Sequence, residues 1–338
     1  MTRPADPTRR PEVRTVSTSD RRPSARELGG LADTPAGPAL DLLPGREVVL
    51  GPGTPVRRLL PTLGRRMVGA WAFVDHYGPD DVSATAGMQV TPHPHTGLQT
   101  VSWLVEGRVH HRDSLGSDVT FGPGELALMT AGHGIAHAEQ SPVPHPRFLQ
   151  GAQLWVALPD AARDTAPAFE HHAALPRATS DGLTTTVLMG GFGGDTSPGT
   201  AHTPIIGVDL DLAAGVDVEV PLEPDFEHAL LGAAGGAEVE GAPLVHGAMV
   251  YLGTGRRSVR IRTEAPARLL LLGGEPFEER LVMWWNFLGR AGEEITEYAE
   301  RWNDGDPRFG AVPGFTDDER QLAPALPPVP LKARGRVR

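Results

Sequence analysis

The sequence of 338 residues contains no cysteine. This absence excludes disulfide bonds, zinc sites with thiolate ligands and iron–sulfur clusters, so a metal centre would have to be built from histidine and carboxylate side chains. It also fits a cytoplasmic protein, and we expect that location. Lysine is almost missing as well, since Lys332 stands beside 30 arginines, a bias typical of GC-rich bacterial coding sequences rather than of a function.

Long hydrophobic runs are also missing. No apolar stretch approaches the roughly 18 residues that a membrane-spanning helix needs. The arginine pairs at 9–10 and 21–22 are not followed by the apolar stretch of a secretory signal. The formal net charge is −11, and a negatively charged surface repels the phosphates of nucleic acids. We therefore expect neither a membrane partner nor direct contact with nucleic acid.

Glycine and proline, in contrast, are abundant, with 41 and 33 residues. They divide the chain into short β-like runs, such as the one in which apolar Val101, Trp103 and Val105 recur at every second position. The pattern predicts an all-β protein with a short C-terminal helix and extended tails. The expected strands cover 46–50, 99–105, 118–121, 126–129 and 152–158, then 184–189, 205–212, 217–221, 229–232, 248–252, 259–262 and 268–272.

This pattern divides the chain into four parts. Residues 1–44 form an Arg/Pro-rich tail that we expect to be mostly disordered. Residues 45–160 form a first β-barrel, and residues 161–290 form a second barrel that we expect to bind no metal. In 291–338, a helix at 293–301 begins with acidic residues that complement its dipole. A proline-rich arm follows, which we expect to run extended across the protein itself.

Two short phrases carry the most specific signal. His93 and His95 lie in the stretch 92–97, and His137 and Glu139 lie in the stretch 134–139. Side chains two residues apart on a strand point to the same face, roughly 6.5–7 Å apart. Two such strands lining one barrel could aim three imidazoles and one carboxylate at a single point. This set suits a divalent first-row transition metal and leaves room for water, dioxygen or substrate.

A single histidine pair of this kind is often only a turn or a solvated strand. Two observations favour a metal site here. The second pair ends in a carboxylate, and eight of the 13 histidines fall within 70 residues of one another. These eight are His76, His93, His95, His110, His111, His133, His137 and His145.

Two tandem barrels with these phrases in the first resemble a bicupin, and specifically the pirin family. The resemblance is dense over 73–79, 93–97, 104–107, 111–114, 129–139 and 153–156, and weaker at 274–276 and 293–295. It implies that His93, His95, His137 and Glu139 bind one ion, expected to be Fe2+, with Ni, Mn, Cu and Zn left open. It implies that Glu139 is both a ligand and the catalytic base.

The resemblance implies two alternative functions, and the sequence does not distinguish between them. The first is a quercetinase, which opens flavonols or related small enols with dioxygen. The second is an iron-binding, redox-responsive regulator that acts through a protein partner, without turnover and without DNA contact of its own. A purely structural metal is a third, weaker reading, because structural zinc sites usually close all four positions.

Two positions depart from the patterns of these families. Many cupins place a ligating glutamate where this chain has Gln99, so the carboxylate must come from Glu139. Pirins usually carry arginine where this chain has His133, which is either a neighbour of the metal ligands or a surface turn residue. Ligating imidazoles need hydrogen-bond acceptors behind them, and the candidates for this role are Asp75, Gln99, His111 and Gln153.

Overall fold

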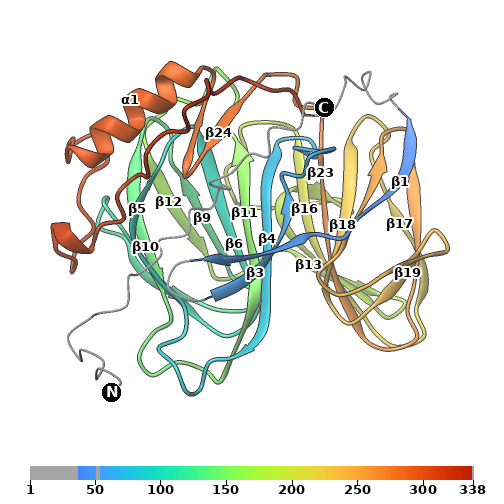
Figure 1. Ribbon diagram of the computed structural model, residues 1–338. Coiled ribbons are helices and arrows are strands. Elements are labelled where there is room, and N and C mark those ends of the chain that lie inside the picture. The colour runs from blue at the N-terminus through green and yellow to red at the C-terminus, as the bar shows by residue number, and fades with distance from the viewer. Residues whose placement is uncertain (1–36, 51–53, 337–338) are drawn as a thin grey trace, which may run out of the picture.

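The protein consists of two β-sandwiches that lie side by side (Figure 1). The computed structural model describes residues 37–50 and 54–336, and the expected tail over residues 1–36 lies outside them. Strands make up most of the described chain, and α1 (Gly292–Asn303) follows them near the C-terminus. The expected all-β class with a short C-terminal helix is therefore confirmed.

The first sandwich packs a seven-stranded sheet against a four-stranded one. The large sheet holds β2 (Arg46–Leu50), β3 (Thr54–Leu60), β4 (Trp71–Asp81), β6 (Leu98–Glu106), β9 (Leu126–Thr130), β11 (Phe148–Ala157) and β12 (Ala168–His172) in the order β12-β9-β6-β11-β4-β3-β2. The small sheet holds β5 (Gln89–His95), β7 (Val109–Asp113), β8 (Asp118–Phe121) and β10 (Ile135–Gln140) in the order β5-β10-β7-β8. The two sheets remain separate, so the expected barrel is an open sandwich.

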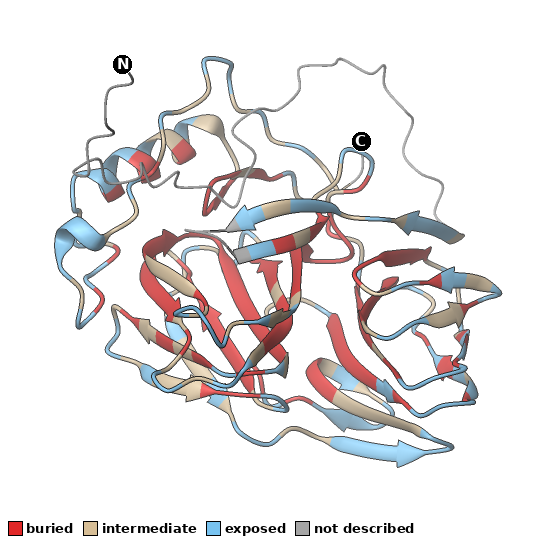
Figure 2. Cartoon of the chain, turned by 60° about the horizontal axis from the view of Figure 1, so that its bottom comes forward, coloured by how far each residue is buried: buried red, intermediate tan, exposed pale blue. Residues whose placement is uncertain are grey.

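The second sandwich repeats this plan with an eight-stranded and a four-stranded sheet. The large sheet holds β1 (Pro38–Leu43), β13 (Arg177–Ser180), β14 (Leu183–Phe192), β15 (Asp195–Thr196), β16 (Ile205–Leu212), β18 (Glu227–Ala234), β21 (Met249–Gly253) and β23 (Ala267–Gly274). The small sheet holds β17 (Asp217–Pro221), β19 (Ala237–Val239), β20 (Ala242–Leu244) and β22 (Ser258–Arg262). Both sandwiches have buried strand interiors (Figure 2).

Two of the segment boundaries expected from the sequence, at residues 44 and 160, differ from those in the structure. Residues 38–43 were assigned to the disordered tail, but they form β1, which pairs with β21 of the second sandwich. Leu40 and Leu42 on this strand are exposed, whereas Ala39 and Leu43 are partly buried against the shared core. The strand depends on this packing and on its ladder to β21, a partner that lies more than 200 residues away in the sequence. β12 lies beyond residue 160, yet it pairs with β9 of the first sandwich.

The large sheets of the two sandwiches face each other and share one hydrophobic core. The indole N–H of Trp71 donates to the carbonyl of Ile206 at 3.1 Å, and that of Trp103 donates to Asp209 Oδ2 at 2.9 Å. Trp103 belongs to the apolar face that the period of two marked in the sequence. That face of β6 therefore packs against the second sandwich. The side chains on the opposite face of β6 point into the interior of the first sandwich.

After the second sandwich, the chain returns to the first (Figure 1). We call residues 281–336 the C-terminal segment. It contains β24 (Val282–Trp284), β25 (Phe287–Gly289), α1 and a short 3-10 helix (Asp317–Glu319). Its buried cluster includes Ala136 and Ala138 of β10 together with the residues on one face of α1: Ile295, Tyr298, Ala299 and Trp302. Their spacing is that of an amphipathic helix.

The proline-rich arm packs into the same cluster through Ala323 and Leu326. The C-terminal segment therefore covers β5 and β10, although it follows the second sandwich in sequence. No helix within the described ranges is long and apolar enough to cross a bilayer.

Candidate metal centre

Strands β5 and β10 bring the two histidine phrases together as neighbours in the small sheet. His137 lies directly opposite His93, and Ile135 lies opposite His95. Side chains two positions apart point to the same face, so His93, His95 and His137 share the face that is turned into the first sandwich. The structure thus brings together the three imidazoles whose convergence the spacing predicted.

The three rings form a compact buried cluster. The ring centroids are 4.4 Å apart for His93 and His137, and 5.0 Å apart for both His93–His95 and His95–His137. The Nε2 atoms of His95 and His137 are separated by 3.1 Å. Two nitrogens bound to one ion at right angles, with bonds of about 2.1 Å, lie about 3.0 Å apart. This pair therefore already has the spacing of metal ligands.

Backbone carbonyls determine which ring nitrogen of His93 and of His95 is available to bind a metal. The Nδ1–H of His93 donates to the carbonyl of Thr91 at 3.0 Å, and the Nδ1–H of His95 donates to that of Asn286 at 3.0 Å. A carbonyl can only accept, so Nδ1 carries the proton and Nε2 keeps a free lone pair. Such bonds orient the histidines of metal sites.

Glu139 lies beside this triad rather than within it. The pairing of β10 with β5 shifts register between His137 and Glu139, so that Glu139 faces Val90. Its pairing with β7 is regular and sets Glu139 opposite His111. Its carboxylate consequently forms a second group with His111 and His137, in which the ligand atoms lie within 4.8 Å of one another, as they do in the triad.

His137 therefore belongs to both groups. Its Nε2 faces His95, while its Nδ1 lies 3.4 Å from Nδ1 of His111. The carboxylate of Glu139 is held by Ser102, whose Oγ lies 3.0 Å from Oε1 of Glu139 and 2.8 Å from Oε1 of Gln153. A hydroxyl has one proton, so Ser102 donates to one of these oxygens at a time.

Burial sets the charge state of the cluster. It lowers the pKa of the His93 imidazole to about 4. Burial, with repulsion between neighbouring rings, holds the pKa of His95 and that of His137 well below the ordinary value. The same burial raises the pKa of the Glu139 carboxyl, against the opposing effects of His111 and Ser102. The rings are thus held neutral, which is the form that binds metal.

The donor set fits a divalent transition metal. It offers three neutral imidazoles with a carboxylate nearby and no sulfur, a combination used by iron, nickel, manganese, copper and zinc. His93 and Glu139 are 6% and 7% exposed, whereas His95 and His137 are 1% exposed. All four side chains are therefore buried, and what little exposure they have belongs to His93 and Glu139.

Two of the expected hydrogen-bond acceptors lie elsewhere. The buried carboxylate of Asp75 forms a bidentate ion pair with Arg58, at 2.8 and 2.9 Å. The side-chain amide of Gln99 donates to Thr130 Oγ1 at 2.9 Å and to the carbonyl of Thr200 at 3.0 Å, on the face turned toward the second sandwich. The side chain of Gln99 therefore points away from the histidine triad, although it stands at the position where many cupins have a ligating glutamate.

His133 joins neither metal group within the described residues. The backbone N–H of His133 donates to the carbonyl of Thr165, and the backbone carbonyl of His133 accepts a hydrogen bond from the guanidinium of Arg308. The other two expected neighbours, His111 and Gln153, do reach the cluster, one through His137 and the other through Ser102.

Sequence reasoning missed three groups at this site: Ser102 and the carbonyls of Thr91 and Asn286. Ser102 was detectable in principle, because it alternates with Val101 and Trp103 and so had to face the opposite side of its strand. The two carbonyls carry no sequence signal, since every residue has one. Asn286 is also 191 residues away from the histidine that it serves.

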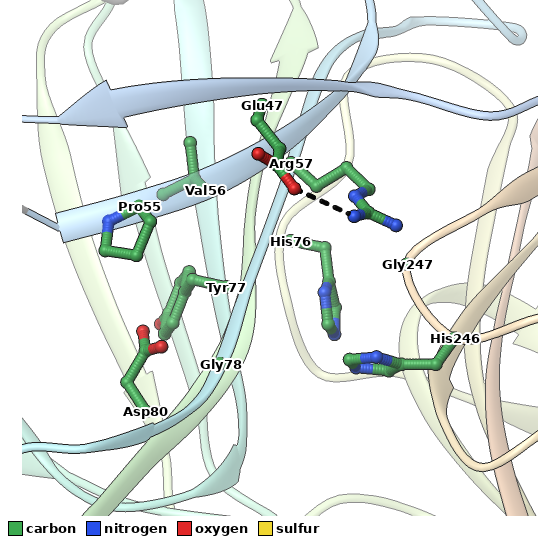
Figure 3. Close-up of a pocket in the computed structure, with 10 residues that line it drawn as sticks. All are labelled: Glu47, Pro55, Val56, Arg57, His76, Tyr77, Gly78, Asp80, His246 and Gly247. Carbon is green, nitrogen blue, oxygen red and sulfur yellow. Dashed lines mark hydrogen bonds and ion pairs between the residues drawn. The ribbon is translucent and has the colours of Figure 1, made fainter.

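A pocket between the two sandwiches lies apart from this cluster (Figure 3). It encloses about 170 Å³ and shares no residue with either metal group. His76 of the first sandwich and His246 of the second point toward each other there, with ring centroids 4.7 Å apart. The Arg57–Glu47 ion pair lies beside them.

The chain matches known families over both sandwiches. The family model described as Pirin covers residues 53–156, and the Pirin C-terminal cupin domain covers residues 207–310. Over 288 residues the chain is 43% identical to a putative quercetin 2,3-dioxygenase of Pseudomonas aeruginosa, an alignment that spans 85% of this chain and 91% of that protein.

Solved structures give the same result. A quercetin 2,3-dioxygenase from Acinetobacter baumannii is 43% identical and superimposes with a TM-score of 0.83, over 87% of this chain and 97% of that one. A bacterial pirin from Escherichia coli, solved in complex with nickel(II), is 16% identical with a TM-score of 0.56, over 71% of this chain and 100% of that one, and shows the likeness of fold. The chain therefore belongs to the pirin family and contains two cupin domains.

Proposed function

We propose that this pirin is a metal-dependent dioxygenase of the quercetinase type, which acts on a flavonol or a related small enol. The observation that carries the proposal is the buried triad of His93, His95 and His137, whose neutral rings lie at ligand spacing. The 43% identity to a quercetin 2,3-dioxygenase and to a putative one supports it.

Fe2+ is the ion that we propose, held by Nε2 of the three histidines with Glu139 as the fourth ligand. When bound, such an ion acts as a Lewis acid and as a template for an enol and dioxygen. Glu139 also accepts the proton of the enol, because burial raises its pKa and thereby makes the carboxylate a better base. Ser102 orients this carboxylate. The buried walls exclude water from the reacting atoms.

The test is anaerobic purification with elemental analysis, followed by oxygen uptake with quercetin and a panel of small enols. The variants are His93→Ala and a matched control, His110→Ala. His110 lies on β7 next to buried His111, but alternation turns it to the outside, where it pairs with Asp118 at 2.6 Å. We expect wild type and His110→Ala to hold stoichiometric iron and to consume oxygen, and His93→Ala to lose both.

Other results would each exclude part of the proposal. Nickel, manganese, copper or zinc at full occupancy with oxygen uptake would replace iron but keep the enzyme. A bound metal without uptake on any enol would refute the enzyme and favour a regulator that acts through a protein partner. A wild-type protein that binds no metal would refute the metal centre itself.

A further inference from the structure

The C-terminal segment contacts the chain around all three histidines of the triad. It reaches His95 directly at the turn between β24 and β25, where the carbonyl of Asn286 accepts the Nδ1–H of His95 at 3.0 Å. This bond fixes the tautomer and the direction of a metal-facing ring. It comes from a part of the chain that follows the whole second sandwich.

His93 is held from the same side by Gln321. The carbonyl of Thr91 that accepts the Nδ1–H of His93 also accepts the side-chain amide of Gln321, at 2.9 Å. The backbone N–H of Gln321 donates to the carbonyl of Pro92 at 2.8 Å. Gln321 therefore makes two bonds to the backbone immediately before His93.

The strand that carries His137 is bound as well. The N–H of Ala136 donates to the carbonyl of Phe309 at 3.0 Å. Ala136 and Ala138, on either side of His137, pack into the same cluster as Phe309 and Phe287. The rear of β10 is thus covered by the C-terminal segment while its front carries the imidazole.

Further bonds hold the C-terminal segment in this position. The indole N–H of Trp302 donates to the carbonyl of Gln321 at 2.7 Å, so α1 holds the arm. Asn303 makes two hydrogen bonds to the backbone of Ala323, at 2.8 and 3.1 Å. Before α1 in the sequence, the backbone N–H of Leu288 in β25 donates to the carbonyl of Thr96 at 3.1 Å.

We propose that residues 286–321 help to form the metal centre by orienting its ligands, with Asn286 as the positioning residue for His95 and Gln321 as that for His93. The inference rests on the proposed metal binding and adds a linkage. If the docked segment aligns two imidazoles, it raises the affinity for metal, and bound metal must stabilise the docked segment by the same free energy. Acceptors behind ligating histidines are worth about 10- to 100-fold in metal affinity.

The first experiment compares full-length wild type with Gln321→Ala and a control, Leu322→Ala, by anaerobic titration of the metal-free proteins with Fe2+ and with Ni2+. Leu322 is the next residue and is 57% exposed. Gln321 acts one bond behind the acceptor of His93, so we expect Gln321→Ala to weaken binding about 3- to 10-fold. Leu322→Ala should bind as wild type does. Equal affinity of wild type and Gln321→Ala would overturn the positioning role.

The second experiment is hydrogen exchange on the full-length wild type with and without metal. We expect metal to slow exchange of the amides of Leu288 and Gln321, which donate to Thr96 and Pro92. The amide of Ala213, bonded to the carbonyl of Gly182 in the second sandwich, is the control and should not change. Unchanged exchange at Leu288 and Gln321, in a protein that binds metal, would overturn the linkage alone. A wild type that binds no metal would overturn both this inference and the proposed function.

Discussion

A buried imidazole can bind a metal only through a nitrogen that carries no proton, and backbone carbonyls make that choice for His93 and His95. His137 differs, because both of its ring nitrogens face other imidazoles. It can join the triad through Nε2 or the group with His111 and Glu139 through Nδ1. At the residue scale, the two roles to be separated are therefore those of Glu139 as a fourth ligand and as a free base.

Glu139→Gln separates these two roles. Glutamine keeps the size and one oxygen, but it cannot take a proton. If Glu139 is a ligand, the variant should bind Fe2+ or Ni2+ at least 10-fold more weakly, as loss of a charged donor demands. If it acts only as a base, metal content should stay stoichiometric while oxygen uptake falls about 10²- to 10⁴-fold. Elemental analysis and oxygen uptake on the same sample measure both, and a variant with full activity would exclude both roles.

At the scale of elements, the end of β5 shows how closely the C-terminal segment approaches the metal ligands. Gly97 has φ +68°, and a Cβ at this position would lie 2.6 Å from the carbonyl oxygen of Leu288, in the middle of β25. Glycine is therefore required twice, for its backbone conformation and for the space. The glycine after the first histidine pair belongs to the docking of β25 and not to metal chemistry.

Gly97→Ala compared with Gly116→Ala tests this explanation. Gly116 has φ +89°, and a Cβ added there would meet no atom within 4 Å, so its substitution costs only the backbone strain of about 1–2 kcal/mol. Gly97→Ala should lower the free energy of unfolding by about 1–3 kcal/mol more, because β25 must shift. Urea unfolding of the metal-free proteins measures the difference. Equal losses for the two variants would show that the close approach has no energetic weight.

At the scale of the whole molecule, the second sandwich is fastened to the first at Glu227. This carboxylate is fully buried and accepts hydrogen bonds from Gly69 N at 2.9 Å and Tyr251 OH at 2.8 Å. It also pairs with Arg65 at 3.4 Å and with Arg336, near the end of the chain, at 2.6 Å. One side chain thus joins both sandwiches and the C-terminal segment.

Removal of this charge should destabilise the protein more than removal of a surface charge. In Glu227→Gln, buried Arg65 loses its partner, and we expect the free energy of unfolding to fall by about 3–5 kcal/mol. The control is Glu47→Gln, whose side chain is 83% exposed beside Arg57, and it should cost less than about 1 kcal/mol. Denaturant unfolding at neutral pH distinguishes the two. Similar values for both would show that Glu227 does not fasten the sandwiches.

The interface between the sandwiches should also respond to acid through His76. Burial, with repulsion from His246, lowers the pKa of His76 from 6.5 to about 4 in the folded protein. The unfolded chain therefore binds this proton at a higher pH than the folded one, and the stability contributed by neutral His76 is present above pH 6.5 and lost as the pH falls toward 4. Between pH 7.5 and 5 this loss amounts to about 2 kcal/mol.

His76→Gln isolates that contribution. Nε2 of glutamine can replace Nε2 of His76, which lies 3.0 Å from the carbonyl of Ala233, but the amide does not titrate. All other titratable groups are common to the two proteins, so both should lose stability on acidification, the variant by about 2 kcal/mol less. Urea unfolding at pH 7.5 and 5 gives the two differences. The same loss in both proteins would contradict the role of His76.

The sequence by itself determined the local features. The period of two, interrupted by glycine and proline, predicted short strands in both halves, and the acidic start at 293–294 predicted the helix. Two His-x-His/Glu phrases predicted that three imidazoles and one carboxylate converge, because alternation on a strand fixes the face of each side chain. The three imidazoles form one group, and Glu139 lies in the adjoining one. The cysteine-free composition restricted the ligands to nitrogen and oxygen.

Only the tertiary structure decided what depends on distant parts of the chain. The pairing of β10 with β7 set Glu139 opposite His111, and a turn 191 residues away supplied the carbonyl behind His95. β1 was not predicted from the sequence, since Leu40 and Leu42 are exposed and its partner strand is the distant β21. Spacing along a strand fixes which face a side chain occupies, whereas register, bulges and backbone acceptors follow from which strands meet.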